Sequence, residues 1–307
     1  MAEILVIKLG ALGDLVQADG ALRDIREHHM SDHLTVMTTP PYRRYMERCP
    51  WVDEVFIDPR ASRFNLFQML GLKNRLKKRP FDQVYDLQQV GRTRFYYRWL
   101  FPQVSWLGDA QGCSFYLKRP VSVCAADHFA RHLDMAGLAI HHTLQSDVSW
   151  MAADVSDILS KADLISSKYI VLIPGASGVH ESKRWPYFKD LATHLIGVGK
   201  RVVTVPGPDE MALCHTIPGD MLVKENGHHD IFSLAGIVKH ADYVIGNDTG
   251  PTHIAAHLGC KGLALYGKHT PAHETGIQHS KFDWLEVENL AALSLENVLM
   301  QINPYLS

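Results

Sequence analysis

Short apolar segments recur along the first half of the chain, and each is followed by a polar turn or by apolar residues at helical spacing. We predict strands at residues 4–7, 34–37, 52–57 and 82–87, with a helix after the first strand that ends near residue 26. A segment that is apolar throughout is typical of a parallel strand covered on both faces. The first half is therefore predicted to form an α/β domain with a parallel sheet.

The strand–helix pattern starts again after residues 150–168, which are polar and helix-like and contain no core strand. We place a domain boundary in this region, with domains at 1–155 and 156–307. The alternation in both halves predicts two doubly wound α/β domains with a cleft between them. The expected strands of the second half are 169–173, 201–205, 241–246 and 262–267, and the expected helices between them are 187–197 and 232–238.

Composition limits the class of protein. The chain has 307 residues, of which 46% are hydrophobic and 21% charged, and its formal net charge is −2. A protein that binds nucleic acid needs a basic surplus to neutralise phosphates, so we expect no nucleic-acid partner. Five cysteines without a C-x-x-C motif favour a reducing compartment. We find neither a leader peptide nor an apolar run long enough to cross a bilayer, and expect a cytoplasmic protein with at most a peripheral contact with the inner membrane.

The segment Asp248-Thr249-Gly250-Pro251 follows the predicted strand 241–246 and opens a predicted helix that Gly259 ends. Pro251 stands at a first helical position, where a missing N–H group is harmless. The start of such a helix offers unpaired backbone N–H groups and the positive end of the helix dipole, which suit a phosphate. The alternative is a capped strand-to-helix turn that binds no ligand.

Other strand ends in the second half carry small or polar residues, at 175–177 and 207–210. Because the carboxyl ends of parallel strands meet at one edge of a sheet, we expect these segments to converge with 248–250. Hydroxyls and a lysine suit phosphates, and a carboxylate suits ribose hydroxyls. The set fits a nucleotide diphosphate, contacted by Ser177, Lys183, Glu210 and Thr249.

Asp14 follows the first strand in the loop Gly10-Ala11-Leu12-Gly13-Asp14. This loop lacks the G-x-G-x-x-G spacing of a dinucleotide-binding turn, so a dehydrogenase is disfavoured. Asp14 would stand where the carboxyl end of a strand opens towards a ligand. Two roles stay open for it, a helix-capping carboxylate and a general base.

His253 and His257 stand four residues apart on the predicted helix, a spacing that can chelate zinc. No glutamate follows His253 as in H-E-x-x-H, and no cysteine is near in sequence to complete a site. We therefore expect no metal ion, and predict that His253 contacts the ligand or packs in the core.

Residues 60–79 contain seven lysines and arginines and no acidic residue. The apolar positions Phe64, Phe67, Leu70 and Leu76 can share one helical face. Such a segment can rest on anionic lipid or hold an acidic substrate. The alternative is a helix docked on the sheet with a solvated basic face.

Several of these motifs together resemble glycosyltransferase family 9, the bacterial heptosyltransferases. The resemblance is carried by Lys183-Arg184-Trp185-Pro186 and by Gly246-Asn247-Asp248-Thr249-Gly250-Pro251-Thr252-His253. Residues 10–14 are similar to the family's first loop, and residues 81–88 to its fourth strand. The similarity extends along nearly the whole chain in the same order.

The resemblance implies a GT-B fold, in which two Rossmann-like domains face each other across a cleft. The domain 1–155 would bind the acceptor and 156–307 the donor, with a last helix at about 294–303 that packs back on the first domain. It implies inverting transfer of heptose from ADP-heptose to the inner core of lipopolysaccharide, without a metal ion or other cofactor. The implied partners are the nucleotide-sugar donor and an acidic, lipid-linked glycan, and we expect a monomer.

The resemblance also implies roles for single residues. Asp14 would be the catalytic base, Gly13 beside it in the first loop would contact the donor, and Lys183 would neutralise the departing diphosphate. Asp248 would orient the sugar, and Glu210 would hold the ribose. The other implied donor contacts are the hydroxyl of Ser177, the backbone amides of Thr249 and Gly250, and His253.

The chain also departs from the family pattern. The segment Ala176-Ser177-Gly178 has one hydroxyl where the family's loop is rich in them, and Pro206-Gly207 replaces a glycine pair. Gly267-Lys268-His269-Thr270 replaces the usual G-P-T. These departures leave open which sugar and acceptor are used. A GT-B nucleotide-sugar epimerase, or a two-lobed binding protein without catalysis, are the alternatives.

Overall fold

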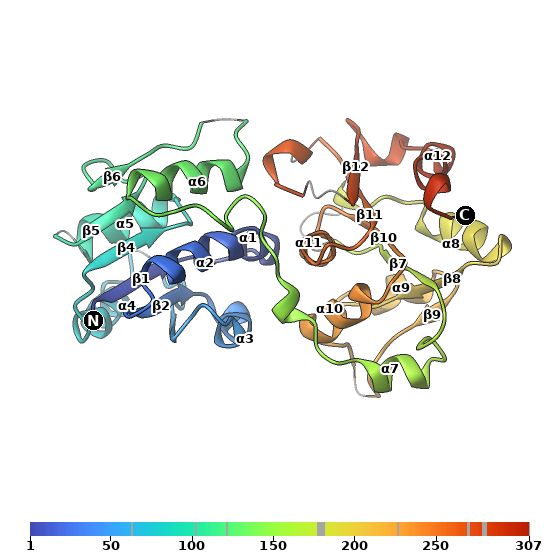
Figure 1. Ribbon diagram of the computed structural model, residues 1–307, viewed down its shortest axis with the longest axis horizontal. Coiled ribbons are helices and arrows are strands. Elements are labelled where there is room, and N and C mark those ends of the chain that lie inside the picture. The colour runs from blue at the N-terminus through green and yellow to red at the C-terminus, as the bar shows by residue number, and fades with distance from the viewer. Residues whose placement is uncertain are drawn as a thin grey trace. The chain divides into compact units, whose positions relative to one another are not determined.

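The computed structural model describes residues 1–62, 64–101, 103–120, 122–176, 182–225, 227–268, 271–277 and 281–306. The chain forms two compact units, Met1–Ser146 and Asp147–Ser307 (Figure 1). The division falls after Ser146, somewhat earlier than the expected boundary at residue 155. Each unit is a parallel sheet with helices, and each is described by itself below.

The first unit is built on a six-stranded parallel sheet in the order β3-β2-β1-β4-β5-β6. Leu5 and Ile7 of β1 pack with side chains of α4 and α5, including Leu72 and Tyr96. Their neighbours Ile4 and Val6 are also buried, which explains why the first predicted strand is apolar throughout. The strands are β1 (Glu3–Ile7), β2 (His33–Thr38), β3 (Glu54–Ile57), β4 (Gln83–Asp86), β5 (Ser105–Gly108) and β6 (Phe115–Tyr116). The helices are α1 (Leu12–Gln17), α2 (Asp19–His28), α3 (Arg43–Arg48), α4 (Leu66–Lys77), α5 (Gly91–Trp99) and α6 (Ala125–Met135).

The second unit has a six-stranded parallel sheet in the order β12-β11-β10-β7-β8-β9. Side chains of β7 alternate between two cores: Val171 and Ile173 pack with α10 and α11, whereas Ile170 and Leu172 pack with α8 and α12. The strands are β7 (Tyr169–Ile173), β8 (Arg201–Thr204), β9 (Asp220–Met221), β10 (Tyr243–Asn247), β11 (Gly262–Tyr266) and β12 (Phe282–Glu286). The helices are α7 (Ser156–Lys161), α8 (Phe188–Gly197), α9 (Met211–His215), α10 (Ile231–Lys239), α11 (Gly250–His257) and α12 (Leu295–Leu306).

Both sheets have the same strand order when the strands are counted from the start of each unit, namely 3-2-1-4-5-6. This is the order of a Rossmann domain, and the prediction of two doubly wound domains is confirmed. The order reverses between β1 and β4 in the first unit and between β7 and β10 in the second. Ligands of such sheets bind beyond the carboxyl ends of the strands at this reversal.

Four strands, β5, β6, β9 and β12, were not predicted from the sequence. Two of them, β6 and β9, have two residues each, too few to produce a pattern. The helix expected after the first strand is divided at Ala18 into α1 and α2. In the described parts of the chain, no helix has the length and apolar character that a membrane crossing requires.

The last helix, α12, places Val298 and Ile302 in the core of the second unit. Near its end, Tyr305 stacks on Tyr243, with 5.4 Å between the ring centroids. The helix is therefore held by its own unit. A contact between α12 and the first unit stays a prediction.

Candidate active site

The turn after β10 has the expected strand–turn–helix form. Thr249 is the N-cap of α11, its backbone is extended, and Pro251 stands in the first turn. A Cβ at Gly246 would meet the Thr252 hydroxyl and the Ile173 side chain, so only glycine fits there. The N–H groups of Thr249 and Gly250 precede the first intrahelical bond, which His253 donates to the Thr249 carbonyl at 3.1 Å. They are therefore available to a ligand at the start of the helix.

Asp248 is shared by a lysine and a histidine. Lys183 Nζ lies 2.6 Å from Asp248 Oδ2, and His253 Nε2 lies 3.3 Å from Oδ1. Burial would raise the pKa of the Asp248 carboxyl, but the hydrogen bonds and charges of His253 and Lys183 hold that pKa below its ordinary value. The carboxylate is therefore ionised at neutral pH and fixes both neighbours. The Lys183 side chain remains partly exposed, so its ammonium group can reach a ligand.

Asn247 joins the segments around this turn, and sequence reasoning missed it. Its Nδ2 donates to the carbonyls of Pro174 and Gly175 at 2.8 and 3.2 Å, and its Oδ1 accepts from the Trp185 amide at 3.0 Å. The Asn247 side chain is buried. It ties the end of β7 and the Lys183-Arg184-Trp185-Pro186 segment to β10. An asparagine at the end of an apolar strand was the available signal.

Glu210 lies against the loop after β7. Its Oε2 accepts from the Gly207 amide at 2.9 Å, and a Cβ on Gly175 would collide with the carboxylate. The ends of β7, β8 and β10 are thus brought together around Gly175, Glu210 and Asp248. Ser177, the expected hydroxyl of this loop, lies outside the described residues.

In the first unit, Asp14 occupies the third position of α1. Its Oδ2 accepts from the Ala11 amide at 3.0 Å, which is a helix-capping contact. The side chain is exposed, and Gly13 stands beside it in the first turn. Capping occupies one oxygen of the carboxylate and does not exclude a role as base, because the residue faces solvent at the carboxyl end of β1.

Two further ionisable residues stand at the reversal of this sheet, and sequence reasoning missed both as site residues. Lys8 follows β1, is buried, and donates from Nζ to the Leu87 carbonyl at 3.1 Å. Asp86 ends β4 and accepts from the amides of Gln88 and Gln89 at 3.0 and 2.9 Å. Burial lowers the pKa of Lys8, which the charges of Asp14 and Asp86 oppose, and burial raises the pKa of Asp86 to about 6. The sequence signal that could have identified Lys8 and Asp86 is a charged residue at the carboxyl end of a predicted strand.

Comparison with known proteins shows the family to which this chain belongs. The model of glycosyltransferase family 9 (heptosyltransferase) matches residues 69–297. The chain belongs to glycosyltransferase family 9. The resemblance seen in the motifs is confirmed, and the protein is a glycosyltransferase, so the epimerase alternative is set aside.

Relatives of this glycosyltransferase are distant in sequence and similar in fold. The lipopolysaccharide core heptosyltransferase OpsX of Haemophilus influenzae is 21% identical over 290 residues, covering 88% of this chain and 80% of that protein. A family 9 glycosyltransferase of Veillonella parvula matches with a TM-score of 0.81 and 19% identity, covering 99% of this chain and 97% of that chain. The structure of Escherichia coli heptosyltransferase WaaC with ADP-2-deoxy-2-fluoro heptose matches with a TM-score of 0.75 and 16% identity, covering 98% of this chain and 99% of that chain. The predicted GT-B fold is confirmed.

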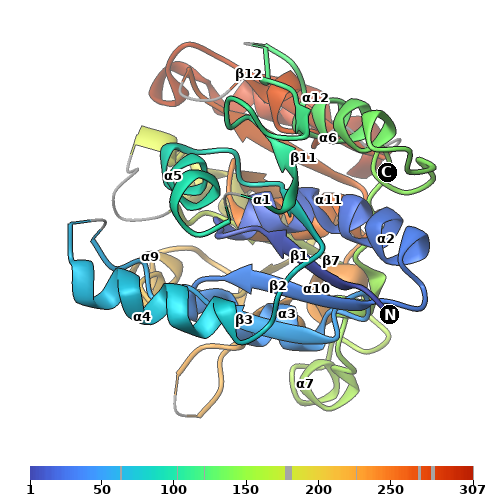
Figure 2. The same ribbon diagram turned by 90° about the vertical axis from the view of Figure 1, so that its left-hand side faces the viewer.

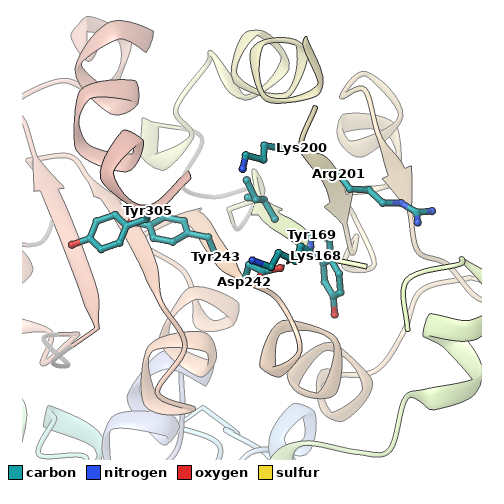
Figure 3. A pocket seen from close by; sticks show the side chains of 8 residues that line it. Lys168, Tyr169, Lys200, Arg201, Asp242, Tyr243 and Tyr305 are labelled. Carbon is teal, nitrogen blue, oxygen red and sulfur yellow. Dashed lines mark hydrogen bonds between the residues drawn. The ribbon is translucent and has the colours of Figure 1, made fainter. Parts of the chain in front are cut away.

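A small hollow of about 60 Å³ in the second unit of the glycosyltransferase lies away from these residues (Figure 3). Lys168, Lys200 and Asp242, which line it, immediately precede β7, β8 and β10. The hollow is therefore at the amino ends of the strands, opposite the Asp248 turn. The stacked rings of Tyr243 and Tyr305 close one side of it.

One cluster among the described residues has the composition of a metal site, formed by Asp24, Glu27 and His142. Asp24 is buried, and its two oxygens accept from the amides of residues 141–143 and from the Thr143 hydroxyl. Glu27 already contacts His142 Nε2 at 2.9 Å. Asp24 thus anchors the segment 141–143 to α2, and its lone pairs are used for that purpose.

Proposed function

We propose that this glycosyltransferase moves heptose, or a related sugar, from ADP-heptose to the inner core of lipopolysaccharide or a related glycan. The observation that carries the proposal is the Lys183–Asp248–His253 cluster at the start of α11, at the strand reversal of a family 9 enzyme. The names of the relatives support the choice of sugar: OpsX is a core heptosyltransferase, and WaaC is described with a fluorinated ADP-heptose.

The second unit would hold the donor. The diphosphate would approach the amides of Thr249 and Gly250 and the ammonium group of Lys183, with the Ser177 hydroxyl as a further donor. As the bond to the sugar breaks, negative charge grows on the departing ADP, and donors fixed in advance stabilise that charge. Asp248 would then face the sugar hydroxyls, supported by His253. Glu210, held by the Gly207 amide, would accept from the ribose.

The first unit would supply the base. In an inverting transfer the acceptor hydroxyl attacks the anomeric carbon from the side opposite the leaving group. Asp14 would remove the proton of that hydroxyl. Gly13, beside it in the first turn, would contact the donor. Lys8 and Asp86, buried at the same sheet edge, would position the loop. Because Lys183 and backbone amides neutralise the diphosphate, we expect the reaction to need no metal ion or other cofactor.

The acceptor would be an acidic, lipid-linked glycan. Residues 60–79 contain no acidic residue, and the described cations of this stretch suit phosphate groups on the acceptor. We expect the enzyme to act as a monomer in the cytoplasm, against the inner membrane.

Nucleotide binding tests the donor site directly. Without added metal, we expect ADP to raise the unfolding temperature of the protein, and UDP, GDP and NAD to have no effect. A ligand at about 100 times its dissociation constant stabilises a protein by about 2.7 kcal/mol, which a thermal-shift measurement detects. Lys183→Ala should abolish the effect of ADP.

The matched control for this measurement is Lys200→Ala, at the opposite edge of the same sheet. It should leave the ADP shift unchanged. A preference for UDP or GDP would remain consistent with a glycosyltransferase, and would show that its donor is not ADP-heptose. Stabilisation by NAD, or by no nucleotide, would contradict the proposed donor site.

A further inference from the structure

The helix α4 carries apolar residues on two opposite sides. Met69, Leu72 and Leu76 are buried in the core of the first unit. On the outside, the exposed fractions are 90% for Phe64, 90% for Phe67, 65% for Leu66 and 48% for Leu70. Of the four residues expected to share one face, Phe64, Phe67 and Leu70 are exposed together, whereas Leu76 belongs to the buried side. Figure 2 shows α4 at the periphery of the first unit.

The four outward residues, Phe64, Leu66, Phe67 and Leu70, form what we call the α4 apolar patch. Phe64 precedes the N-cap Asn65, whose side chain accepts from the Gln68 amide at 3.1 Å. A hydrophobic residue in this position often packs on the fourth residue of the helix, here Met69. Phe64 is instead exposed while Met69 is buried, so the local partner that would cover the ring is turned inward. Clustered exposed aromatic and aliphatic side chains mark an interaction surface.

Cations continue the same outer face. With 3.6 residues per turn, Lys77 falls two turns after Leu70, and Lys78 falls three turns after Phe67. Both lysines are exposed, and no side-chain partner is found for either among the described residues. Other cations of the stretch are engaged: Lys73 donates to the Trp99 carbonyl at 2.9 Å, and Arg79 pairs with Glu54. The outer face of α4 therefore has an apolar end and a basic end.

We propose that this face docks on a membrane surface containing anionic phospholipid, with the α4 apolar patch inserted at the acyl boundary and Lys77 and Lys78 at the headgroups. An amphipathic segment with large apolar side chains beside lysines is the form that interfacial helices take. Between Asp58 and Asp82 no acidic residue opposes the lipid charge. The inference does not depend on which nucleotide sugar the enzyme uses.

Two other occupants fit the surface less well. A soluble acidic glycan would satisfy the lysines and leave Phe64 and Phe67 in water. A second copy of the chain, paired through this face about a twofold axis, would set the lysines against lysines or against apolar side chains and offer them no acidic partner from this stretch. A bilayer surface supplies both an apolar layer and negative charge.

Co-sedimentation with vesicles tests the proposal on the full-length protein. We expect binding to vesicles of phosphatidylethanolamine and phosphatidylglycerol, and none to vesicles of phosphatidylcholine alone. Lys77→Gln/Lys78→Gln should weaken partitioning about 30-fold, because each cation near an anionic surface contributes about fivefold. Phe64→Ser/Phe67→Ser should weaken it by at least about tenfold through loss of apolar burial. Added salt should weaken vesicle binding by the wild type and have little further effect on vesicle binding by the Lys77→Gln/Lys78→Gln variant.

The control variants make the same kinds of substitution in the second unit. Ile165→Ser/Met300→Ser removes two exposed apolar residues, and Lys189→Gln one exposed lysine, all from the second unit. These variants should bind vesicles like the wild type. Circular dichroism and the ADP thermal shift, which should not change in any variant, separate loss of docking from misfolding and from failure of the donor site.

The proposal is overturned if the wild-type protein does not bind anionic vesicles. It is also overturned if the Phe64→Ser/Phe67→Ser variant binds them as well as the wild type does. Sedimentation equilibrium of the free protein checks the competing occupant. A dimer that the Phe64→Ser/Phe67→Ser change converts to a monomer would assign the face to a second copy and also overturn membrane docking.

Discussion

The carboxylate of Asp248 shows how the site is built residue by residue. It neutralises Lys183 and fixes His253, and these two contacts hold its own pKa below the ordinary value. If this turn holds the diphosphate as proposed, a fixed cation beside backbone amides needs little rearrangement when charge develops. Asn247, behind it, holds the neighbouring strand ends in place.

Asp86 gives the first unit a pH dependence that can be measured. Because its pKa is raised to about 6, the folded protein keeps the proton that the unfolded chain loses near pH 4. The contribution of Asp86 to stability should therefore fall as pH rises from about 4 to about 6 and stay level above that. Asp86→Asn retains the oxygen that accepts from Gln88 and Gln89 and removes the buried charge.

We expect Asp86→Asn to stabilise the protein relative to wild type, by on the order of 2–3 kcal/mol more near pH 7 than near pH 4. Urea denaturation at both pH values measures the difference. The exposed residue Asp157, changed to Asn, controls for loss of a negative charge. A difference in stability between Asp86→Asn and the wild type that is the same at both pH values would show that the pKa of Asp86 is not raised in the folded protein.

Sequence reasoning reached Asp14, Lys183, Glu210 and Asp248 because each follows a strand or belongs to a motif. Lys8 and Asn247 were not reached, because their importance depends on burial. Lys8 is covered in part by Phe129, whose ring centroid lies 5.3 Å from Nζ, and the two residues are far apart in the sequence. Contacts of that kind are set by the folded chain and leave no local pattern.

At the scale of elements, apolar runs identified the central strands because both faces of those strands are covered. In the edge strand β12 only Phe282 is buried, and the other four residues are half-buried or exposed. The strand therefore lacks such an apolar run. The core-facing side of helix α4 could not be predicted for another reason. Its apolar residues lie on both a buried and an exposed side, so their spacing does not show which side faces the core.

The loop after β7 supplies a prediction at this scale. A methyl group at Gly175 would collide with the Glu210 carboxylate, so Gly175→Ala should displace Glu210 from its contact with the Gly207 amide. We expect the KM for the donor to rise about tenfold with a smaller change in kcat, since a ribose contact serves binding in the ground state and the transition state alike. Steady-state kinetics with varied donor gives both constants.

Gly197→Ala is the matched control, because no atom lies within 4 Å of the added methyl group. It should leave the kinetics unchanged. If Gly175→Ala changes kcat and leaves KM for the donor as it was, Glu210 does not hold the ribose.

At the scale of the whole molecule, two Rossmann-like units repeat one strand order, and each places its polar residues at its own strand reversal. The first offers a carboxylate, and the second offers a lysine and helix amides. Transfer of a sugar with inversion needs a base and a stabilised leaving group from separate directions, which two units can provide. That the first unit binds the acceptor and the second the donor stays a prediction, and the motifs support it only through their resemblance to family 9.

The most direct test of the account is sugar transfer itself, measured as ADP released from ADP-heptose in the presence of lipopolysaccharide that lacks core heptose. We expect release that requires both substrates and persists with a chelator. Asp14→Asn should slow it by about 100- to 10,000-fold while ADP still stabilises the variant, because loss of a general base removes that much rate and leaves donor binding intact. Transfer by Asp14→Asn at the wild-type rate, or no release by the wild type from ADP-heptose, would contradict the account.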